Sequence, residues 1–403
     1  MATKGQHKKK PVRYYFEYLI INVFVFGGIW LLSFIVLNIA IFNQFTQAFR
    51  DFTLTDIYYS SVMKLDSIYN GPLEIINIED KNREEIAYMI QRIEEGKPKV
   101  VGMDIIFKER LDSVGDEVLK NTVAKYNNIV FPYIAAFDKN SNESRNDIYF
   151  NIKERSFVNQ PGGTKENATV RNHYAVYNNK PAFTTAVLQM YDPKKASILL
   201  NKGEKKIEIR YFGNGQNFKY KNFKEVMDPS WDPSEIKDKI VLFGYMGLPG
   251  KTLPLDEDRF FTPLNQQLSG RSYPDMYGVV VHANILRMAL DNDYVYVFPT
   301  WLNWLVAFTL SLVLLPLFVS WYVEKAVWFH LFTMLVQLFL SIFFVFLTIR
   351  VYGSLNIKVE SSAVLVSILL IGDFLLFYDH LVKFFKYKMH WNIRSKFLKG
   401  GHG

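Results

Sequence analysis

The chain of 403 residues contains no cysteine. Disulfide bonds, cysteine-ligated metal sites and thiol catalysis are therefore excluded, and a cysteine-free chain suits an oxidising compartment. The sequence also has no G-x-x-x-x-G-K-[ST] motif for nucleotide phosphates, and no G-x-G-x-x-G motif in the context of a dinucleotide site. We therefore expect no enzyme activity, no catalytic residue, no cofactor and no metal site.

Charged residues are nearly absent from four long stretches, although the chain carries a net charge of +8. A helix rises about 1.5 Å per residue, so these stretches are long enough to cross a hydrocarbon core of roughly 30 Å. A cleaved signal peptide is the alternative for the first stretch, but its apolar run exceeds the usual length of about 7–15 residues. We predict membrane-spanning helices at residues 18–42, 299–323, 326–350 and 361–381.

Basic residues gather at both ends of the chain, in tails that comprise residues 1–17 and 382–403. Lysine and arginine next to membrane helices tend to stay on the cytoplasmic side. Both tails are then cytoplasmic, which requires an even number of spans and places residues 43–298 outside the cytoplasm. We expect a multi-pass protein of a bacterial cytoplasmic (inner) membrane with a periplasmic domain.

The second tail alternates basic residues with aromatic ones, among them Phe384, Tyr387 and Trp391. Such patterns occur in nucleic-acid sites. Directly after a membrane span, however, the pattern favours a helix that lies on anionic lipid. We therefore expect membrane lipids as a partner and no nucleic acid, with docking of a partner helix as the alternative role.

The outer domain, residues 43–298, alternates short apolar runs with amphipathic segments, which is typical of an α/β fold with a mixed, largely parallel sheet. Its size is sufficient for a hydrophobic core of its own. Helical spacing of apolar residues predicts helices at 83–94, 118–126 and 181–190, and a further one after 282–284. Strands are predicted at 73–78, 99–107, 129–135, 206–212, 240–243 and 279–281.

Short segments of this domain follow one another in a characteristic order and spacing. They are KVVGMDIIF at 99–107, SFVNQPGGTKENATVR at 156–171, PAF at 181–183, IRYFG at 209–213, IVLFG at 240–244 and GVVVHAN at 278–284.

These segments resemble the CHASE domain of type 2, an extracytoplasmic sensory module of bacterial kinases and cyclases. Asp258 with Thr262 and Pro263 resembles the "D…TP" element of that family, whereas Asn167 and Ala168 replace its Asp-Gly pair. The resemblance covers about residues 45–298 and implies a sensory input domain. In the family the membrane helices usually lead into a cytoplasmic output domain, while only the basic tail follows them here.

Several polar residues of the outer domain are candidates for a ligand site. Glu79 and Asp80 follow the first predicted strand, and Asp104 lies in the second. Ligand sites gather at the carboxyl ends of parallel strands, so these residues and Asp258 could form a carboxylate pocket for a cation or an amine. We expect Asp104 and Asp258 to approach one another. The alternative is a structural role in which the carboxylates accept hydrogen bonds from nearby turns.

His282 follows the predicted strand at 279–281 and precedes a helix. It is a candidate pH switch or ligand contact, although a hydrogen-bonded core position is the more ordinary role for a lone histidine. It has neither a neighbouring nucleophile for a triad nor a second histidine at the spacing of metal ligands.

Among the polar residues within the predicted spans, His330 and Asp373 are candidates for a functional contact. A carboxylate inside a membrane is energetically costly and usually faces protein. We predict a polar contact between these two side chains, with a proton or ion path as the alternative.

Two functional hypotheses follow from the sequence. The first is an extracytoplasmic sensory or recognition protein without catalytic output, acting through a membrane or cytoplasmic partner protein. The alternative is a structural or accessory subunit of a larger bacterial cell-envelope complex. Either function is compatible with a homo-oligomer.

Overall fold

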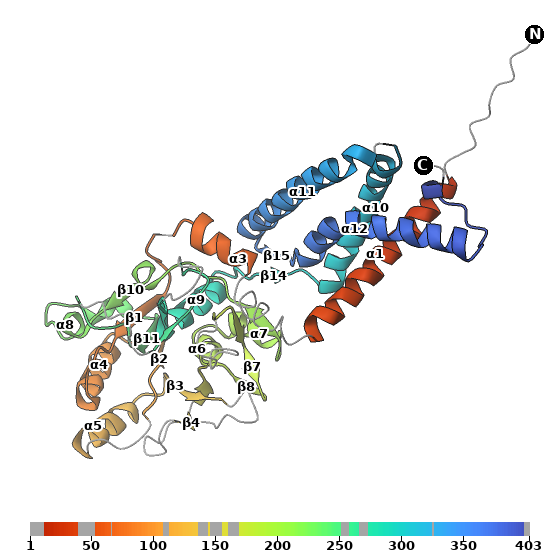
Figure 1. Ribbon diagram of the computed structural model, residues 1–403. Helices are drawn as coiled ribbons and strands as arrows, with labels where there is room; N and C mark the ends of the chain where they lie inside the picture. Colours follow the sequence, from red (N-terminus) through yellow and green to blue (C-terminus); the bar gives the residue numbers. More distant parts are fainter. Residues whose placement is uncertain are drawn as a thin grey trace, which may run out of the picture. The chain divides into compact units, whose positions relative to one another are not determined.

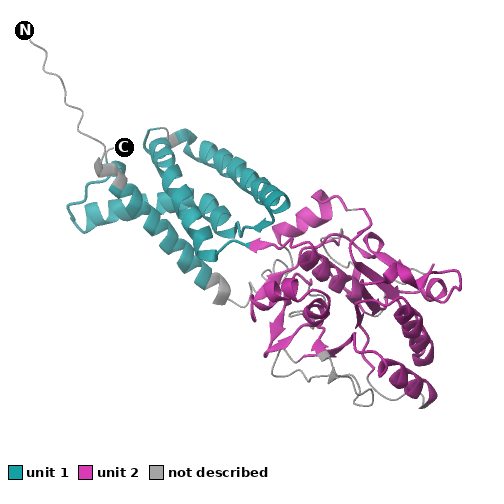
Figure 2. Cartoon of the chain, turned by 180° about the vertical axis from the view of Figure 1, so that it is seen from behind, with its two compact units in different colours: residues 1–50, 297–403 teal, residues 51–296 magenta. Residues whose placement is uncertain are grey.

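The computed structural model describes residues 12–38, 53–65, 67–107, 113–135, 144–145, 155–159, 169–250, 258–265, 273–324 and 326–398 (Figure 1). The chain forms two compact units, which are residues 51–296 and residues 1–50 with 297–403 (Figure 2). Asn167 and Ala168, named above, lie outside the described part, as does the segment 1–11 of the first tail.

A seven-stranded sheet forms the centre of the unit 51–296, with strand order β10-β1-β11-β2-β3-β4 and with β5 beside β3. All pairs are parallel except the pair of β3 and β4. The predicted mixed, largely parallel α/β sheet is therefore confirmed. Its strands are β1 (Leu73–Asn77), β2 (Val100–Met103), β3 (Ile129–Ile134), β4 (Ser144–Arg145), β5 (Arg155–Phe157), β10 (Lys219–Lys221) and β11 (Ile240–Gly244).

The strand β11 lies between β1 and β2 in the sheet, although in the sequence it comes more than 130 residues after β2. Ile240 pairs with Leu73 on one side and with Val100 on the other. Every residue of β1 and β11 is buried, as expected for parallel strands that are covered on both faces. The predicted strand–helix–strand unit at 73–107 is therefore parallel, but its two strands are not neighbours.

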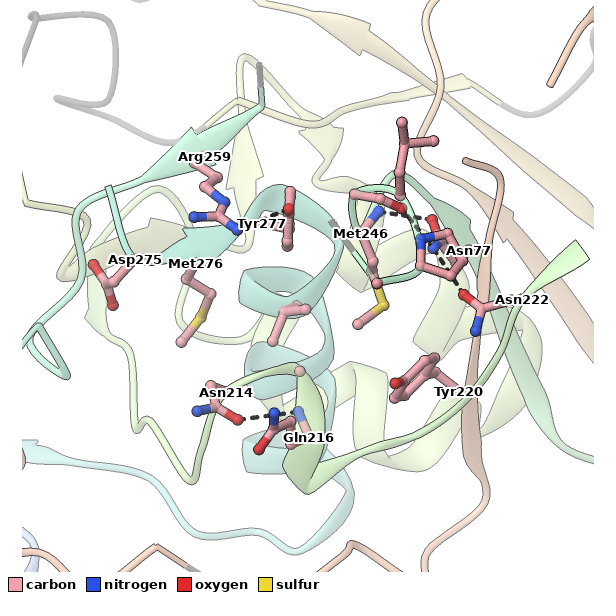
Figure 3. A pocket seen from close by; sticks show the side chains of 16 residues that line it. Asn77, Asn214, Gln216, Tyr220, Asn222, Met246, Arg259, Asp275, Met276 and Tyr277 are labelled. Atoms are coloured by element: carbon pink, nitrogen blue, oxygen red, sulfur yellow. Dashed lines mark hydrogen bonds between the residues drawn. The ribbon is translucent and has the colours of Figure 1, made fainter. Parts of the chain in front are cut away.

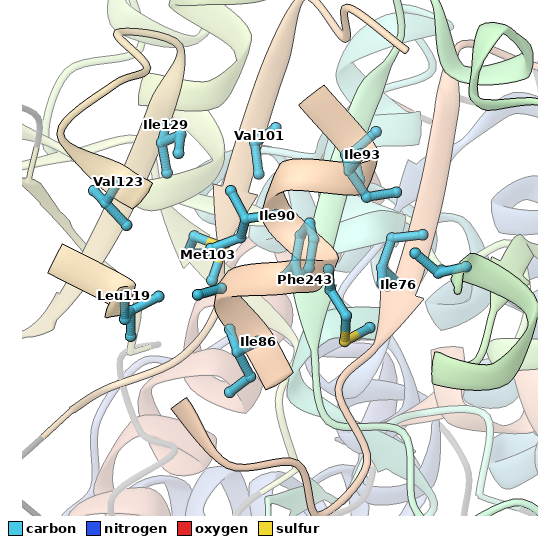
Figure 4. Packing of buried hydrophobic residues seen from close by; sticks show 14 of the residues in the cluster. Ile76, Ile86, Ile90, Ile93, Val101, Met103, Leu119, Val123, Ile129 and Phe243 are labelled. Carbon is cyan, nitrogen blue, oxygen red and sulfur yellow. The ribbon is translucent and has the colours of Figure 1, made fainter. Parts of the chain in front are cut away.

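Helices cover both faces of this sheet. On one face, α4 (Arg83–Glu95) and α5 (Ser113–Val123) pack onto alternate residues of the strands, among them Ile76, Val101 and Phe243 (Figure 4). On the other face lie α6 (Phe183–Tyr191) and α9 (Gly278–Leu290). Their close approach requires glycine, since a Cβ on Gly244 would lie 2.5 Å from that of Val279.

Short elements complete the unit. Two contacts of Arg171 with the Asp56 carboxylate, at 2.6 and 3.1 Å, hold the entering segment to the domain. The helical elements are α3 (Leu54–Ile57), η2 (Tyr58–Val62), α7 (Pro193–Leu200), η4 (Gly215–Asn217), α8 (Phe223–Val226) and η5 (Pro233–Ile236). The extended elements are β6 (Asn172–Tyr174), β7 (Val176–Tyr177), β8 (Lys180–Pro181), β9 (Lys206–Glu208), β12 (Arg259–Phe260), β13 (Met276–Tyr277) and β14 (Tyr296–Val297).

The predicted strand at 279–281 is wrong, because these residues form the first turn of α9. Twelve of the thirteen residues of this helix are buried. A helix that is buried all round shows no amphipathic period, and three consecutive valines favour a strand on propensity alone. The predicted strand at 206–212 is shorter than expected and corresponds to β9.

The second unit contains four helices that are long and apolar enough to cross a membrane, counted among the described residues. One precedes and three follow the α/β unit, as predicted. They are α1 (Val12–Asn38), α10 (Thr300–Glu324), α11 (Ala326–Leu355) and α12 (Ser362–Lys383), and β15 (Ile357–Lys358) lies between the last two.

Polar and small residues join these helices. Asn22 of α1 is fully buried, donates a hydrogen bond to the Phe308 carbonyl at 2.9 Å and accepts one from the Ser311 hydroxyl at 2.7 Å. Gly28 of α1 faces the ring of Phe374 of α12. Interhelical hydrogen bonds and small residues at close contacts are the usual means of helix association in lipid.

The tail that follows α12 folds back onto the helices. A π-helical turn, η6 (Phe384–Lys388), extends α12, and η7 (Lys396–Leu398) is a separate turn. Phe397 is 3% exposed, and its ring lies 5.5 Å from that of Tyr322. The Glu17 carboxylate accepts a hydrogen bond from the Lys396 N–H at 3.1 Å. Residues 389–395 between the two turns are not helical, and burial of the Phe397 ring holds the end of the tail against the bundle. The expected contact with lipid stays a prediction.

Candidate functional site

The unit 51–296 contains a cavity of about 390 Å³ beyond the carboxyl ends of β1 and β11 (Figure 3). This is the edge where open parallel sheets place their ligand sites. The cavity is lined by Asn77, Asn214, Gly215, Gln216, Tyr220, Asn222, Met246, Gly247, Leu248, Pro249, Gly250, Arg259, Asp275, Met276, Tyr277 and Val280.

Asn77, the last residue of β1, organises one wall of the cavity. Its carboxamide oxygen accepts hydrogen bonds from the N–H groups of Glu79 and Met246, at 3.1 and 2.9 Å. Its nitrogen donates to the Asn222 side chain and to the Gly247 carbonyl, at 3.0 and 2.9 Å. One buried amide thus fixes the loop after β11, so this wall is formed without a ligand.

Charged side chains at the opposite wall are engaged with protein groups. Arg259 donates to the Tyr277 hydroxyl at 2.8 Å, and its guanidinium lies 4.5 Å from the centre of that ring. The Asp275 carboxylate accepts hydrogen bonds from the N–H and hydroxyl of Thr262. Burial raises the pKa of Asp275 to about 6.

The floor of the cavity is the turn η4, which a residue of α9 supports. Asn284 is fully buried, accepts from the Phe212 N–H at 2.7 Å and donates to the Gly213 carbonyl at 3.0 Å. The side-chain amide of Gln216 forms no hydrogen bond with another described residue, and the ring of Tyr220 is 42% exposed. These two side chains therefore offer an amide and a phenol to an occupant.

The helix α9 begins at the cavity. Met276 and Tyr277 of β13 and Val280 of the first turn of α9 all belong to its lining. The N–H of Gly278 donates to the Asp258 carbonyl at 3.1 Å. The start of α9 is therefore part of the cavity wall.

Two of the predicted acidic ligands have other positions. Glu79 has a positive φ of 53° and accepts from the Phe223 N–H at 2.9 Å, so it braces the turn after β1. Asp80 is exposed in the same turn. Neither lines the cavity, and the contact of Glu79 favours the structural alternative for that residue.

The other three predicted residues meet at the carboxyl end of β2, outside the cavity lining. The His282 Nε2 atom lies 3.9 Å from an oxygen of Asp104. Burial and the charge of Asp258 raise the pKa of Asp104 well above its usual value. The expected approach of the two carboxylates stays a prediction. Burial raises the pKa of Asp258 to about 6 and lowers that of His282 to about 4.

His173 of β6 is a member of this cluster that the sequence pattern did not indicate. It is fully buried, and neither ring nitrogen has a hydrogen-bond partner among the described residues. Burial, followed by the charge of His282, lowers the pKa of His173 to about 3. At neutral pH both imidazoles are therefore uncharged.

The family of the chain follows from a comparison with known proteins. The CHASE2 domain family matches residues 29–316. The chain belongs to the CHASE2 domain family. The resemblance seen in the sequence is confirmed, and the chain carries an extracytoplasmic sensory domain. No curated protein and no solved structure matches the chain significantly.

The CHASE2 match extends beyond the α/β unit. It begins within α1 and ends within α10. The family pattern thus includes parts of the apolar helices that flank the domain. The described residues contain no group of three or more His, Asp or Glu side chains that could hold a metal ion.

The amides of the cavity were missed by the sequence analysis, which concentrated on carboxylates and histidine. Asn77 at the end of a buried strand, together with glycines at 244, 247 and 250, was the available signal. Asn214 and Gln216 line the cavity because of the position of η4. This turn is far from Asn77 in the sequence, and no sequence motif marks it.

The membrane residues His330 and Asp373 are not brought together. Both are exposed, and no hydrogen bond or ion pair joins them in the described part of the chain. The buried carboxylate of α12 is instead Asp379, which accepts from the Tyr322 hydroxyl and from Lys383, at 2.5 and 2.8 Å. Asp373 lies off the buried face of α12, which explains why the predicted internal contact is absent.

Proposed function

We propose that this CHASE2 protein is a membrane-anchored sensor that binds a small ligand in the cavity at the start of α9 and acts through a partner protein. The main support is that Tyr277 and Val280, at the start of α9, line the cavity. Only nine residues separate the end of α9 from the membrane helix α10. A ligand that shifts the start of α9 can therefore displace α10 through this short connecting segment.

The chemistry of the lining favours an uncharged polar ligand. Its charged residues, Arg259 and Asp275, already bond to protein groups. Gln216 supplies a hydrogen-bonding amide, and Tyr220 and Met246 supply an aromatic ring and an apolar surface. A small saccharide or amide fits this combination better than an anion or a metal ion does.

A thermal-shift screen tests this function on the purified full chain in detergent, with small saccharides, amides and amino acids as probes. A ligand at 100 times its Kd stabilises the folded state by about 2.7 kcal/mol. We expect a compound that raises the Tm of the wild type and not that of Gln216→Ala or Tyr220→Ala. Lys237→Ala, at an exposed position before β11, is the matched control. Failure of every compound to distinguish these variants would count against a sensory cavity.

The alternative proposal is a structural subunit of an envelope complex, which the exposed intramembrane carboxylate of Asp373 favours. A structural subunit requires a fixed complex and no ligand-dependent change. Mass photometry of the complex purified in mild detergent, with and without a compound from the screen, separates the two functions.

A further inference from the structure

The carboxylate of Asp373 lies at the middle of a membrane helix. It stands eleven residues after Ser362 and ten residues before Lys383, which bound α12. With a rise of about 1.5 Å per residue, it is roughly 15 Å from either end of the helix. This places the carboxylate near the centre of a hydrocarbon core of roughly 30 Å.

Asp373 belongs to an outer stripe of α12 whose side chains are exposed, although α1 and α11 reach its edges: the ring of Phe377 lies 5.9 Å from that of Phe24, and Gln337 donates to the Leu369 carbonyl. At spacings of three and four residues this stripe contains Val366, Leu369, Asp373, Phe377 and His380, all of which are exposed. The opposite face of α12 is buried and carries Val364, Ile368, Ile371, Leu375 and Asp379.

The position of Asp373 is costly for an isolated chain. A charged side chain at the bilayer centre is energetically costly, and such residues almost always face protein or a water-filled cavity. Asp373 forms no hydrogen bond or ion pair with another described residue. A further membrane helix that covers the outer stripe would remove this cost.

A second copy of this chain lacks the charge that would match Asp373. In the four spans the only lysine or arginine away from the ends of α12 is Arg350. Gln337 of α11 packs beside Gly372, and Arg350 lies thirteen residues further along that helix, about 20 Å away. A copy related by a two-fold axis along the membrane normal would instead place one Asp373 opposite the other.

From these observations we propose that the outer stripe of α12 docks a membrane-spanning helix of a partner protein that carries lysine or arginine at mid-span, paired with Asp373. Leu369 and Phe377 supply the apolar contact on either side of the ion pair. The inference goes beyond the proposed function and rests on none of the cavity residues.

Photo-crosslinking in the native membrane tests this proposal with the full chain. Phe377→p-benzoylphenylalanine places the probe on the outer stripe, and Phe339→p-benzoylphenylalanine places it on α11, where Phe339 is 70% exposed. We expect Phe377, and not Phe339, to crosslink a protein whose membrane helix has lysine or arginine at its middle. Asp373→Leu should reduce this crosslink by about tenfold or more, since breaking a desolvated ion pair costs more than 1.4 kcal/mol.

Two further variants separate docking from folding. Asp373→Glu keeps the charge and should retain the crosslink, whereas changing the partner's basic residue to leucine should remove it as Asp373→Leu does. The Tm of the purified Asp373→Leu chain should not fall, because no internal contact is lost. A crosslink only to a second copy, only to lipid, or to a helix without a central basic residue would overturn the proposal, as would a crosslink insensitive to Asp373→Leu.

Discussion

Asn284 shows how one buried side chain supports the candidate site. Its amide oxygen accepts from the N–H groups of Phe212 and Gly213, and its nitrogen donates to the carbonyls of Gly213 and Val280. The residue thereby joins α9 to the segment that precedes η4. The side chain is fully buried, so water cannot replace these bonds if they are lost.

Replacement of Asn284 by leucine should destabilise the domain. The backbone groups at 212 and 213 would lose their partners, and each unsatisfied buried group costs about 1–3 kcal/mol. We expect a loss of roughly 2–4 kcal/mol, measured as a fall in Tm or in the urea midpoint of the full chain in detergent. Asn121→Leu, at an exposed position of α5, is the control, and equal stability of the two variants would contradict the assigned role.

Asp104 should make stability depend on pH. Its pKa is raised in the folded chain, so the folded chain holds the carboxyl proton more tightly than the unfolded chain does. Below the pKa of the unfolded chain, near 3.8, Asp104 does not reduce the stability of the folded state. As the pH rises from there towards the pKa of the folded chain, the free energy of unfolding falls. The lowered pKa of His282 acts in the opposite sense between about 4 and 6.5.

Asp104→Asn should therefore be more stable than the wild type at pH 7.5, with an advantage that shrinks as the pH falls towards 4. The measurement is the difference in Tm between the two proteins across this range. A difference that does not vary with pH would show that Asp104 is not desolvated in the folded chain.

Among the helices and strands, those with a clear pattern of apolar residues were predicted correctly. The amphipathic helix α4 and the buried strands β1 and β11 carry clear apolar periods or runs, and their predicted bounds agree with the structure within one residue. The helix α9 was misassigned at its start because burial on all sides removes the period. The placement of β11 between β1 and β2 depends on pairing across the chain, which no local pattern contains.

The same reasoning applies to the candidate site. The position of Asp104 at the carboxyl end of β2 was predictable from the apolar run that precedes it. The cavity was not, because its amides become neighbours only when η4, the loop after β11 and the start of α9 converge. The internal partner predicted for Asp373 failed because hydropathy gives the depth of a residue in a span but not the direction that its side chain takes.

The pairing of α1 with α12 can be tested with two adjacent glycines. A Cβ on Gly28 would lie 2.1 Å from the ring of Phe374, whereas one on Gly27 would have no neighbour within 4 Å. Gly28→Leu should lower the free energy of unfolding by about 1–3 kcal/mol, as is typical of overpacking, and should therefore lower the Tm. Gly27→Leu should change neither. Similar effects of both substitutions would argue against this helix contact.

For the whole molecule, the basic tails and the four spans together predict the topology. The absence of cysteine makes each introduced cysteine a unique label. Lys237→Cys in the α/β unit should react with a membrane-impermeant maleimide on intact spheroplasts, whereas Lys388→Cys should react only after permeabilisation. The reverse pattern would invert the proposed orientation.

The central claim is that occupancy of the cavity alters the start of α9 and the membrane helix that follows it. A thiol adduct on Gln216→Cys fills the cavity, so the ligand need not be identified first. The same adduct on Lys237→Cys, before β11, is the control. Hydrogen–deuterium exchange of the full chain in nanodiscs then reports on α9 (Gly278–Leu290) and the first turns of α10. We predict that the adduct at 216, and not the one at 237, changes exchange in both segments. Unchanged exchange in α9 and α10 with the cavity filled would contradict the account.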